Sequence, residues 1–258
     1  AMIARENGLE PLLQAIKAQR SAAPEVLAEG FITEAVPTVK DALNGARDIA
    51  TEELSESAEL LGKLRDFMRR EARVTAKVIE GKEQAGAKFS DYFDHSEKWS
   101  EIASHRALAI LRAAKEEIVS MEIAPEPEEG ADRAIAMIAA YLGAGTDQPG
   151  DLWLRTVARW AWRVKFSISL HIDLLGELRQ RAHEDAITVF SRNLKDLLLA
   201  APAGAKATLG LDPGIRTGVK AAVVDATGKL LETATLYPFQ PKMDLRGAEA
   251  KIIDLVTR

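Results

Sequence analysis

The spacing of apolar residues changes once along this 258-residue chain, after the stretch AAPAG at 200–204. Before that stretch, apolar residues recur every three or four positions, which is the spacing of amphipathic helices. After it they follow a period of two, which is typical of strands. The change predicts a helical body at 1–204 and a second domain that begins at 205, because proline and glycine end the last helix.

The helical part of the sequence carries its own start signals and two interruptions. Thr38 and Asp41 stand three residues apart, as in a capping box, and Ser104 is expected to cap a later helix. Alternating apolar residues predict a short strand or extended connector at 74–78 and a short strand at 118–123.

The longest helical pattern runs through residues 151–200. Its apolar stripe continues to Leu197 and begins with Trp153, Val157, Trp160, Val164 and Ile168. The β-prone segment FSISL at 166–170 interrupts this pattern, and Gly176 costs about 1 kcal/mol relative to alanine within a helix. The pattern therefore favours two helices with a break near 167–171 over one long helix.

Beyond residue 204 the sequence predicts three strands followed by a helix. The strands are expected at 208–212, 219–224 and 229–236, with tight turns at 214–218 and 225–228. Helical spacing returns at 245–256. Three consecutive strands and a helix are the opening of an α/β domain, and no 20–50-residue repeat is visible.

Composition excludes several classes of function. Cysteine is absent and the four histidines are scattered, so disulfides, cysteine-ligated zinc and thiol nucleophiles are excluded, and we expect no metal site and no cofactor. The formal charge of −5 excludes a wholly basic nucleic-acid module but not a local basic patch. No apolar run approaches the ~18 residues of a membrane span, and the first residues lack the apolar core of a signal peptide. We therefore expect a cytoplasmic protein without membrane contact.

The stretch LGLDPGIRTG at 209–218 is the local segment with a chemical interpretation. It predicts that Asp212 ends a buried strand, beside glycines that let another backbone approach closely. Ribonuclease H-like nucleases place their first metal-binding carboxylate in this way, and actin-type ATPases and sugar kinases use a similar strand and hairpin for a nucleotide phosphate and magnesium. The alternative is that Asp-Pro-Gly merely forms a turn.

Catalysis at Asp212 would require further acids. Two-metal catalysis needs several carboxylates that hold ions ~4 Å apart. Asp225 is expected at the far turn and Glu232 within the third strand, so neither is expected beside Asp212. We therefore expect that this chain is not an enzyme and that Asp212 is a vestigial candidate.

Four stretches together resemble the Tex family of bacterial transcription accessory proteins. LGLDPGIRTGVKAAVVDATGKLLETATLY at 209–237 resembles the start of that family's YqgF-type, ribonuclease H-like domain. Three earlier stretches resemble its helical N-terminal region: EGKEQAGAKF at 80–89, SHRAL at 104–108 and RNLKDLLLAAPAG at 192–204. The resemblance implies a mainly α fold, in which a multi-helix region at 1–204 precedes a truncated ribonuclease H-like β-β-β-α segment at 205–258.

The resemblance also implies a function. It points to a nucleic-acid-binding scaffold that acts with the transcription machinery and RNA polymerase, with RNA favoured over DNA. A Tex-like protein is expected to be much longer and to end in an S1 domain, to which RNA contact is mainly attributed, so this chain resembles an excerpt. The family's YqgF-like domain is generally regarded as lacking a complete nuclease site, and Asp212 matches the position of the first nuclease carboxylate.

Basic residues offer a second route to nucleic acid. Two groups of cations lie on helical patterns: Lys63, Arg65, Arg69, Arg70 and Arg73, and then Arg155, Arg159, Arg163 and Lys165. Trp153 and Trp160 share the apolar stripe beside the second group, so we expect both to be buried rather than to stack on bases. The expected nucleic-acid contacts are Arg155, Arg159, Arg163, Arg216 and Lys220.

Three alternatives remain open from the sequence. A ribonuclease H-like or resolvase-type nuclease, or an ATPase, would require a metal at Asp212. The alanine-rich helices could instead dock protein partners. A truncated sheet would expose an unpaired edge strand, which predicts a mobile tail or self-association through that edge.

Overall fold

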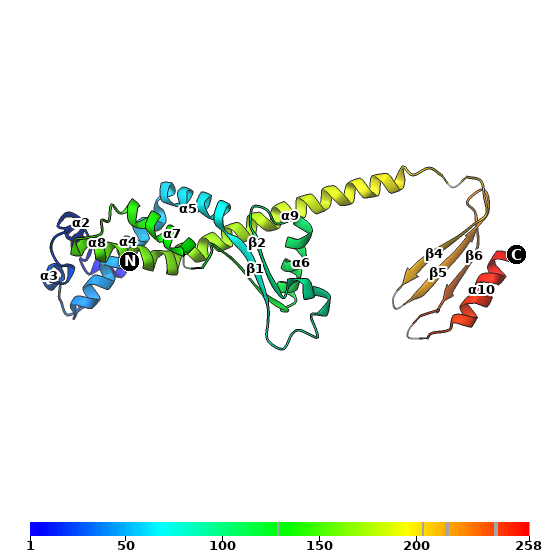
Figure 1. Cartoon of the computed structure of the whole chain (residues 1–258), viewed down its shortest axis with the longest axis horizontal. Helices are drawn as coiled ribbons and strands as arrows, with labels where there is room; N and C mark the ends of the chain where they lie inside the picture. Colours follow the sequence, from blue (N-terminus) through cyan, green and yellow to red (C-terminus); the bar gives the residue numbers. More distant parts are fainter. Residues whose placement is uncertain (128, 203, 215–216, 240–241, 258) are drawn as a thin grey trace. The chain divides into compact units, whose positions relative to one another are not determined.

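The computed structural model describes residues 1–127, 129–202, 204–214, 217–239 and 242–257. Contacts between residues divide the chain into two units, Ala1–Ser191 and Arg192–Arg258. The first is mainly helical with a small sheet, and the second has a β-β-β-α order (Figure 1). The mainly α class with a terminal α/β segment is therefore confirmed.

Helices make up most of the first unit, and the last of them continues into the first residues of the second. In chain order the α-helices and the 3-10 helix η1 are α1 (Met2–Glu6), α2 (Glu10–Ala18), α3 (Pro24–Glu29), α4 (Val39–Glu56), α5 (Ala58–Glu71), η1 (Ala87–Tyr92), α6 (Ser104–Lys115), α7 (Glu129–Tyr141), α8 (Pro149–Ala161) and α9 (Ser167–Leu198). One continuous core joins them, with leucines and isoleucines of α2, α4 and α5 fully buried at its start. The predicted helix starting after Thr38 is α4, and the hydroxyl of Thr38 accepts a hydrogen bond from the Asp41 N–H at 3.1 Å.

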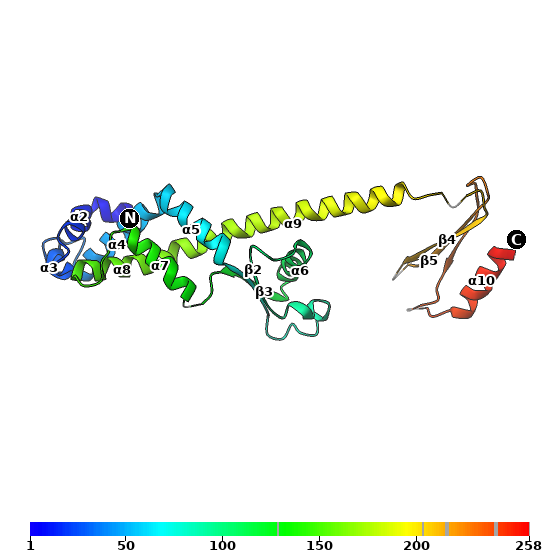
Figure 2. The same ribbon diagram turned by 45° about the horizontal axis from the view of Figure 1, so that its top comes forward.

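The longest helical segment is continuous rather than broken. Between α8 and α9 lies a π-helical turn, η2 (Trp162–Phe166), and the backbone stays right-handed helical at Ala161 and Ser167 on either side. Figures 1 and 2 show the segment running on from α8 into α9. The predicted break near 167–171 is therefore wrong, because the β-prone residues there are accommodated within the helix.

The π turn also changes which residues are buried. A π turn adds a residue relative to the α period, so the residues after it face a different side. Phe166 and Leu170 are fully buried, whereas Val164 and Ile168, which were predicted on the stripe, are 37% and 56% exposed. Trp162 is buried, and Trp153 is half-buried and packs against the core, as expected. Trp160 is half-buried and is not among the core residues, which corrects the expectation for that ring.

The buried stripe of α9 ends earlier than predicted. Leu174, Leu178 and Ala182 are fully buried, but the large apolar residues beyond them are exposed. Phe190 and Leu197, for example, are 67% and 74% exposed. The apolar spacing of this segment therefore continues past the part of the helix that packs on the core of the first unit.

A three-stranded antiparallel sheet is inserted between α5 and α7. Its strands are β1 (Arg73–Val78), β2 (Asp94–Lys98) and β3 (Val119–Ala124), in the order β2-β1-β3. The two strands expected at 74–78 and 118–123 are confirmed. The third, β2, has the polar sequence DHSEK and gives no apolar alternation, so its position was not predicted.

The cap expected at Ser104 is wrong. Ala103 precedes α6 and makes no side-chain cap, while Ser104 is the first helical residue. The Ser104 hydroxyl instead donates a hydrogen bond to the carboxylate of Asp185 on α9. Ser104 therefore joins two helices rather than closing the end of one.

The second unit confirms the predicted order of strands and helix. Strands β4 (Thr208–Gly214), β5 (Gly218–Val224) and β6 (Leu230–Leu236) form an antiparallel sheet, and α10 (Leu245–Thr257) covers one face. A small core of β5, β6 and α10 side chains joins the two layers. Gly218 has a positive φ of 79°, and a Cβ there would lie 2.6 Å from the Leu236 carbonyl, so the turn into β5 requires glycine.

Candidate nucleic-acid interface

The predicted basic residues of the long helical segment lie at the junction between α8 and the π turn. Arg155 and Arg159 belong to α8, and Arg163 and Lys165 to η2. The Nε of Arg155 donates to the carbonyl of Gly145 at 2.6 Å, which fixes this side chain against the loop before α8. Arg159, Arg163 and Lys165 are exposed.

Trp160 lies beside two cations, one of which is Arg163 from the predicted group. The guanidinium carbon of Arg47, on α4, lies 3.8 Å from the ring centroid of Trp160, and that of Arg163 lies 5.2 Å away. Both contacts are within the range of cation–π attraction. The half-buried ring thus lies next to one cation of α4 and one cation of η2. Arg47 was missed in the sequence, since a contact from a distant helix leaves no local signal.

Arg47 pairs with Asp48 at 3.2 Å and is half-buried, but the other cations of this junction lack an acidic partner in the part of the chain that the structure describes. Within the described part of the chain, Arg159, Arg163 and Lys165 form no ion pair. We call the set Arg47, Arg159, Trp160, Arg163 and Lys165 the Trp160 cluster. Unpaired exposed cations next to an aromatic ring are suited to bind phosphate and to stack against bases.

The other basic group predicted from sequence is largely paired with acids. Arg65 contacts Asp173 at 2.8 Å, and Arg69 contacts Glu177 at 2.8 Å. Lys63 pairs with Glu59, and Arg73 begins β1 instead of lying on the helix. The Arg65 and Arg69 contacts tie α5 to α9, and all three pairs satisfy charges that would otherwise be available to phosphates.

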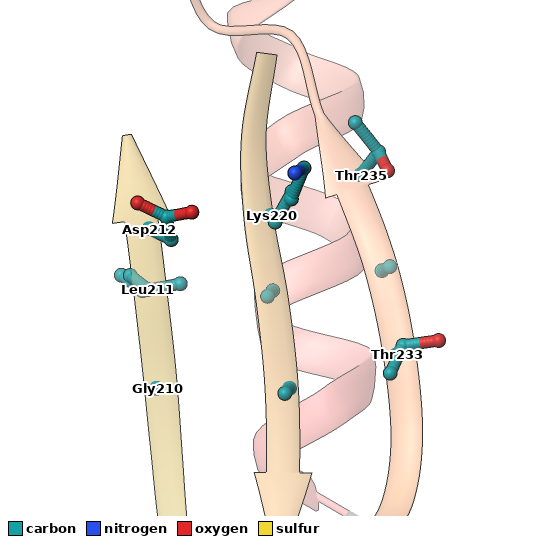
Figure 3. Close-up of a pocket in the computed structure, with 9 residues that line it drawn as sticks. Gly210, Leu211, Asp212, Lys220, Thr233 and Thr235 are labelled. Carbon is teal, nitrogen blue, oxygen red and sulfur yellow. The ribbon is translucent and has the colours of Figure 1, made fainter. Parts of the chain in front are cut away.

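Asp212 lies on the open face of the second sheet. Asp212 on β4, Lys220 on β5 and Thr235 on β6 are opposite one another in the strand register, and Figure 3 shows them in one row across the sheet. Thr233 lies one row further along the same face. A shallow pocket of about 730 Å³ covers these rows. Asp212 is exposed, which corrects the expectation of a buried strand: β4 is an edge strand, and α10 covers the opposite face.

The neighbouring acids of this sheet have other partners. The carboxylate of Asp225 accepts hydrogen bonds from the Thr227 hydroxyl at 2.7 Å and from the Thr227 and Lys229 N–H groups, and these bonds lower the pKa of Asp225. Glu232 contacts Lys251 at 3.0 Å. Glu232 is opposite Val223 in the register, so it lies in a different row from Asp212.

Among the described residues no group of three or more His, Cys, Asp or Glu is placed to hold a metal ion. Lys220 is exposed on the open face of the sheet, as a contact to nucleic acid would require. Arg216, the remaining expected contact, lies outside the described residues. The row therefore brings together one carboxylate, one ammonium group and threonine hydroxyls, which can bind polar groups of a ligand by hydrogen bonds and charge.

Comparison with protein families assigns both parts of the chain. A family model described as Tex central region-like matches residues 19–190, and one described as Tex protein YqgF-like domain matches residues 206–258. The chain belongs to the Tex family.

Two bacterial relatives that match most of the chain support this assignment, and a human protein matches a shorter part. The chain is 47% identical to the transcriptional accessory protein Tex of Neisseria gonorrhoeae over 244 residues, which cover 93% of the chain and 32% of that protein. It is 46% identical to protein YhgF of Escherichia coli over 92% of the chain and 31% of that protein. A human S1 RNA-binding domain-containing protein is 34% identical over 62 residues, or 24% of the chain and 6% of that protein. The chain spans about a third of the length of the two bacterial relatives.

The Tex-family assignment spans both units. The Trp160 cluster lies within the central-region match, and Asp212 and Lys220 lie within the YqgF-like match. No helix in the described parts of the chain is both long enough and apolar enough to cross a bilayer.

Proposed function

We propose that this Tex-family chain is a nucleic-acid-binding scaffold that acts with the transcription machinery, binds RNA in preference to DNA and performs no catalysis itself. The observation that carries the proposal is the Trp160 cluster. Its unpaired cations, Arg159, Arg163 and Lys165, offer charge to phosphates, and the exposed part of its half-buried ring offers a surface to a base. The names of two relatives, a transcriptional accessory protein and an S1 RNA-binding domain protein, support the link to transcription and RNA.

The chemistry of the Trp160 cluster favours a single strand over a duplex, and the preference for RNA is supported by the name of the S1 RNA-binding relative. Stacking on an aromatic ring requires an unpaired base, whereas a duplex offers mainly its phosphates. We therefore expect single strands to bind more tightly than duplexes at equal salt. Contact with RNA polymerase, through this chain or through other parts of a longer protein, belongs to the same proposal.

Fluorescence anisotropy with labelled single-stranded and duplex RNA and DNA tests the proposal. The double variant Arg159→Gln and Arg163→Gln should weaken binding to single-stranded RNA, since it removes two phosphate partners. The control variant Lys77→Gln and Lys82→Gln removes the same charge from exposed positions on β1 and the loop after it, and should leave affinity nearly unchanged. No binding at low salt, or equal losses in both variants, would contradict the role of the Trp160 cluster.

The absence of catalysis is tested separately at Asp212. Incubation of the chain with labelled RNA, DNA duplexes and branched DNA in magnesium or manganese should yield no cleavage, because a lone carboxylate does not hold a metal pair. Metal-dependent cleavage that disappears in Asp212→Ala would establish a nuclease instead. This result would leave the binding proposal standing, because it concerns a different unit.

A further inference from the structure

A groove in the first unit lies between α6, β3 and α9, and none of its lining residues belongs to the Trp160 cluster. In Figures 1 and 2, α6 lies next to α9 and the β1–β3 sheet. The groove has a volume of about 950 Å³. Two hydrogen bonds join the elements around it: the Ser104 hydroxyl of α6 donates to Asp185 of α9, and the Ile123 N–H of β3 donates to Nδ1 of His171 of α9 at 3.1 Å.

The floor of the groove is aliphatic. Leu108 and Leu111 of α6, Met121 of β3 and Leu175 of α9 line it and are each half-buried. Leu108, Met121 and Leu175 pack against the core from one side and remain open on the other. Apolar side chains that are still partly exposed gain free energy when a second apolar surface covers them, at roughly 25 cal/mol per Å².

The rim of the groove is cationic. The cations are Arg112 and Lys115 of α6 and Arg179 of α9; His183 of α9 also lines the rim, and all four side chains are exposed. Arg112 pairs with Glu116 at 2.9 Å, but in the described part of the chain Lys115 and Arg179 have no ion pair. No carboxylate is among the lining residues of the groove. This local excess of positive charge contrasts with the net charge of −5 of the chain.

We propose that this groove, which we call the α6–α9 groove, binds an amphipathic helix of a protein partner whose apolar face is flanked by acidic residues. The aliphatic floor takes the apolar face, and Lys115 and Arg179 on opposite sides pair with the acidic flanks. Helix binding in an apolar groove is a common mode of peptide recognition. Charge complementarity would set its orientation and its rate of association.

Two observations favour a helix over other occupants. β3 is an edge strand, but the Ile123 N–H already donates a hydrogen bond to His171. This bond hinders the pairing of a further strand with β3 at that position. The groove is lined by no aromatic ring other than the imidazoles of His171 and His183, so it lacks the Trp, Tyr or Phe surfaces on which nucleic-acid bases stack most readily. An aliphatic floor suits leucine and methionine side chains better than bases.

The test uses the whole chain and a fluorescein-labelled helical peptide of about 18 residues, long enough to form a helix in solution. Its leucines occupy one face and glutamates flank them. Two matched peptides carry lysines in place of the glutamates or serines in place of the leucines. The acidic amphipathic peptide should bind at least about tenfold more tightly than either control peptide.

Charge reversal at the rim completes the test. Lys115→Glu together with Arg179→Glu should weaken binding of the acidic peptide at least about tenfold and improve binding of the lysine-flanked peptide. Lys77→Glu with Lys82→Glu is the matched control, and tryptophan fluorescence checks that each variant is folded. The proposal is overturned if the three peptides bind alike, if rim reversal has no greater effect than the control, or if single-stranded RNA binds at the rim while the acidic peptide does not.

Discussion

Phe166 and Ile168 stand two residues apart near the start of α9, and alanine at each position tests the π turn. The π turn buries Phe166 completely and leaves Ile168 56% exposed, whereas an uninterrupted α period predicts Ile168 on the apolar stripe. Removing a buried phenylalanine side chain costs about 3–5 kcal/mol, because apolar contacts are lost and a cavity remains. Alanine at an exposed position changes stability by at most about 0.5 kcal/mol. We therefore expect the free energies of unfolding of the two variants to differ by about 2.5 kcal/mol or more.

Urea unfolding followed by tryptophan fluorescence measures this difference. The tryptophans, at 99, 153, 160 and 162, all lie in the first unit, so the signal reports that unit even if the second unfolds separately. With an m-value of roughly 2–3 kcal/mol/M, Phe166→Ala should lower the midpoint by about 1–2.5 M, and Ile168→Ala should leave it nearly unchanged. Equal shifts, or a larger shift for Ile168→Ala, would refute the buried face that the π turn creates.

The remaining stability predictions use the same unfolding assay. Gly150→Ala should destabilise the first unit by about 1–3 kcal/mol, because a Cβ there would lie 3.0 Å from the Cα and carbonyl oxygen of Arg20. An unchanged stability would mean that the start of α8 packs less closely on the backbone at Arg20. Gly176→Ala, within α9 and with no atom within 4 Å of its added Cβ, should stabilise the unit by about 0.5–1 kcal/mol, and a loss would argue against a helix there. Glu97→Gln should destabilise the unit at pH 7, because hydrogen bonds from Arg106 lower the pKa of Glu97. A carboxylate whose pKa is lowered in the folded state stabilises the protein above its ordinary pKa of about 4.3, and this stabilisation is lost as the pH falls below that value. The difference in free energy of unfolding between Glu97→Gln and the parent chain should therefore shrink as the pH falls from about 5 to 3. A difference that stays constant over this range would contradict the prediction.

The fold of the second unit could be predicted from the sequence because its signals are local. Alternating apolar residues and turn residues mark β4, β5 and β6, and each strand pairs with its neighbour along the chain. Asp225 closes the turn before β6 through its own hydrogen bonds, as its place in a predicted turn suggests. The same reasoning identified β1 and β3 and the cap at Thr38, since each depends on a few adjacent residues.

The features that the sequence did not reveal depend on contacts between distant segments. The apolar spacing does not reveal the π turn, because Trp160, Val164 and Ile168 recur at the α-helical period through it. β2 is polar and is held by its hydrogen bonds to β1. Ser104 looks like a cap in sequence, but in the structure it bonds Asp185 from another helix.

The candidate site was predicted only in part for the same reason. Arg159 and Arg163 are exposed, as phosphate contacts must be, and that much follows from a charged helix face. The position of Trp160 between the α4 cation Arg47 and Arg163 depends on how α4 packs on α8. The roles of Arg155, Arg159, Arg163, Arg216 and Lys220 in binding remain predictions.

The salt dependence of RNA binding tests the central claim most directly. The logarithm of the affinity for single-stranded RNA should fall linearly with the logarithm of salt concentration, by about 0.7 for each phosphate contact. Replacing Arg159, Arg163 and Lys165 by glutamine should make this slope shallower by about 2 if all three cations contact phosphate. A slope that stays the same in this variant, with binding retained, would show that RNA is held elsewhere and would contradict the Trp160 cluster as the interface.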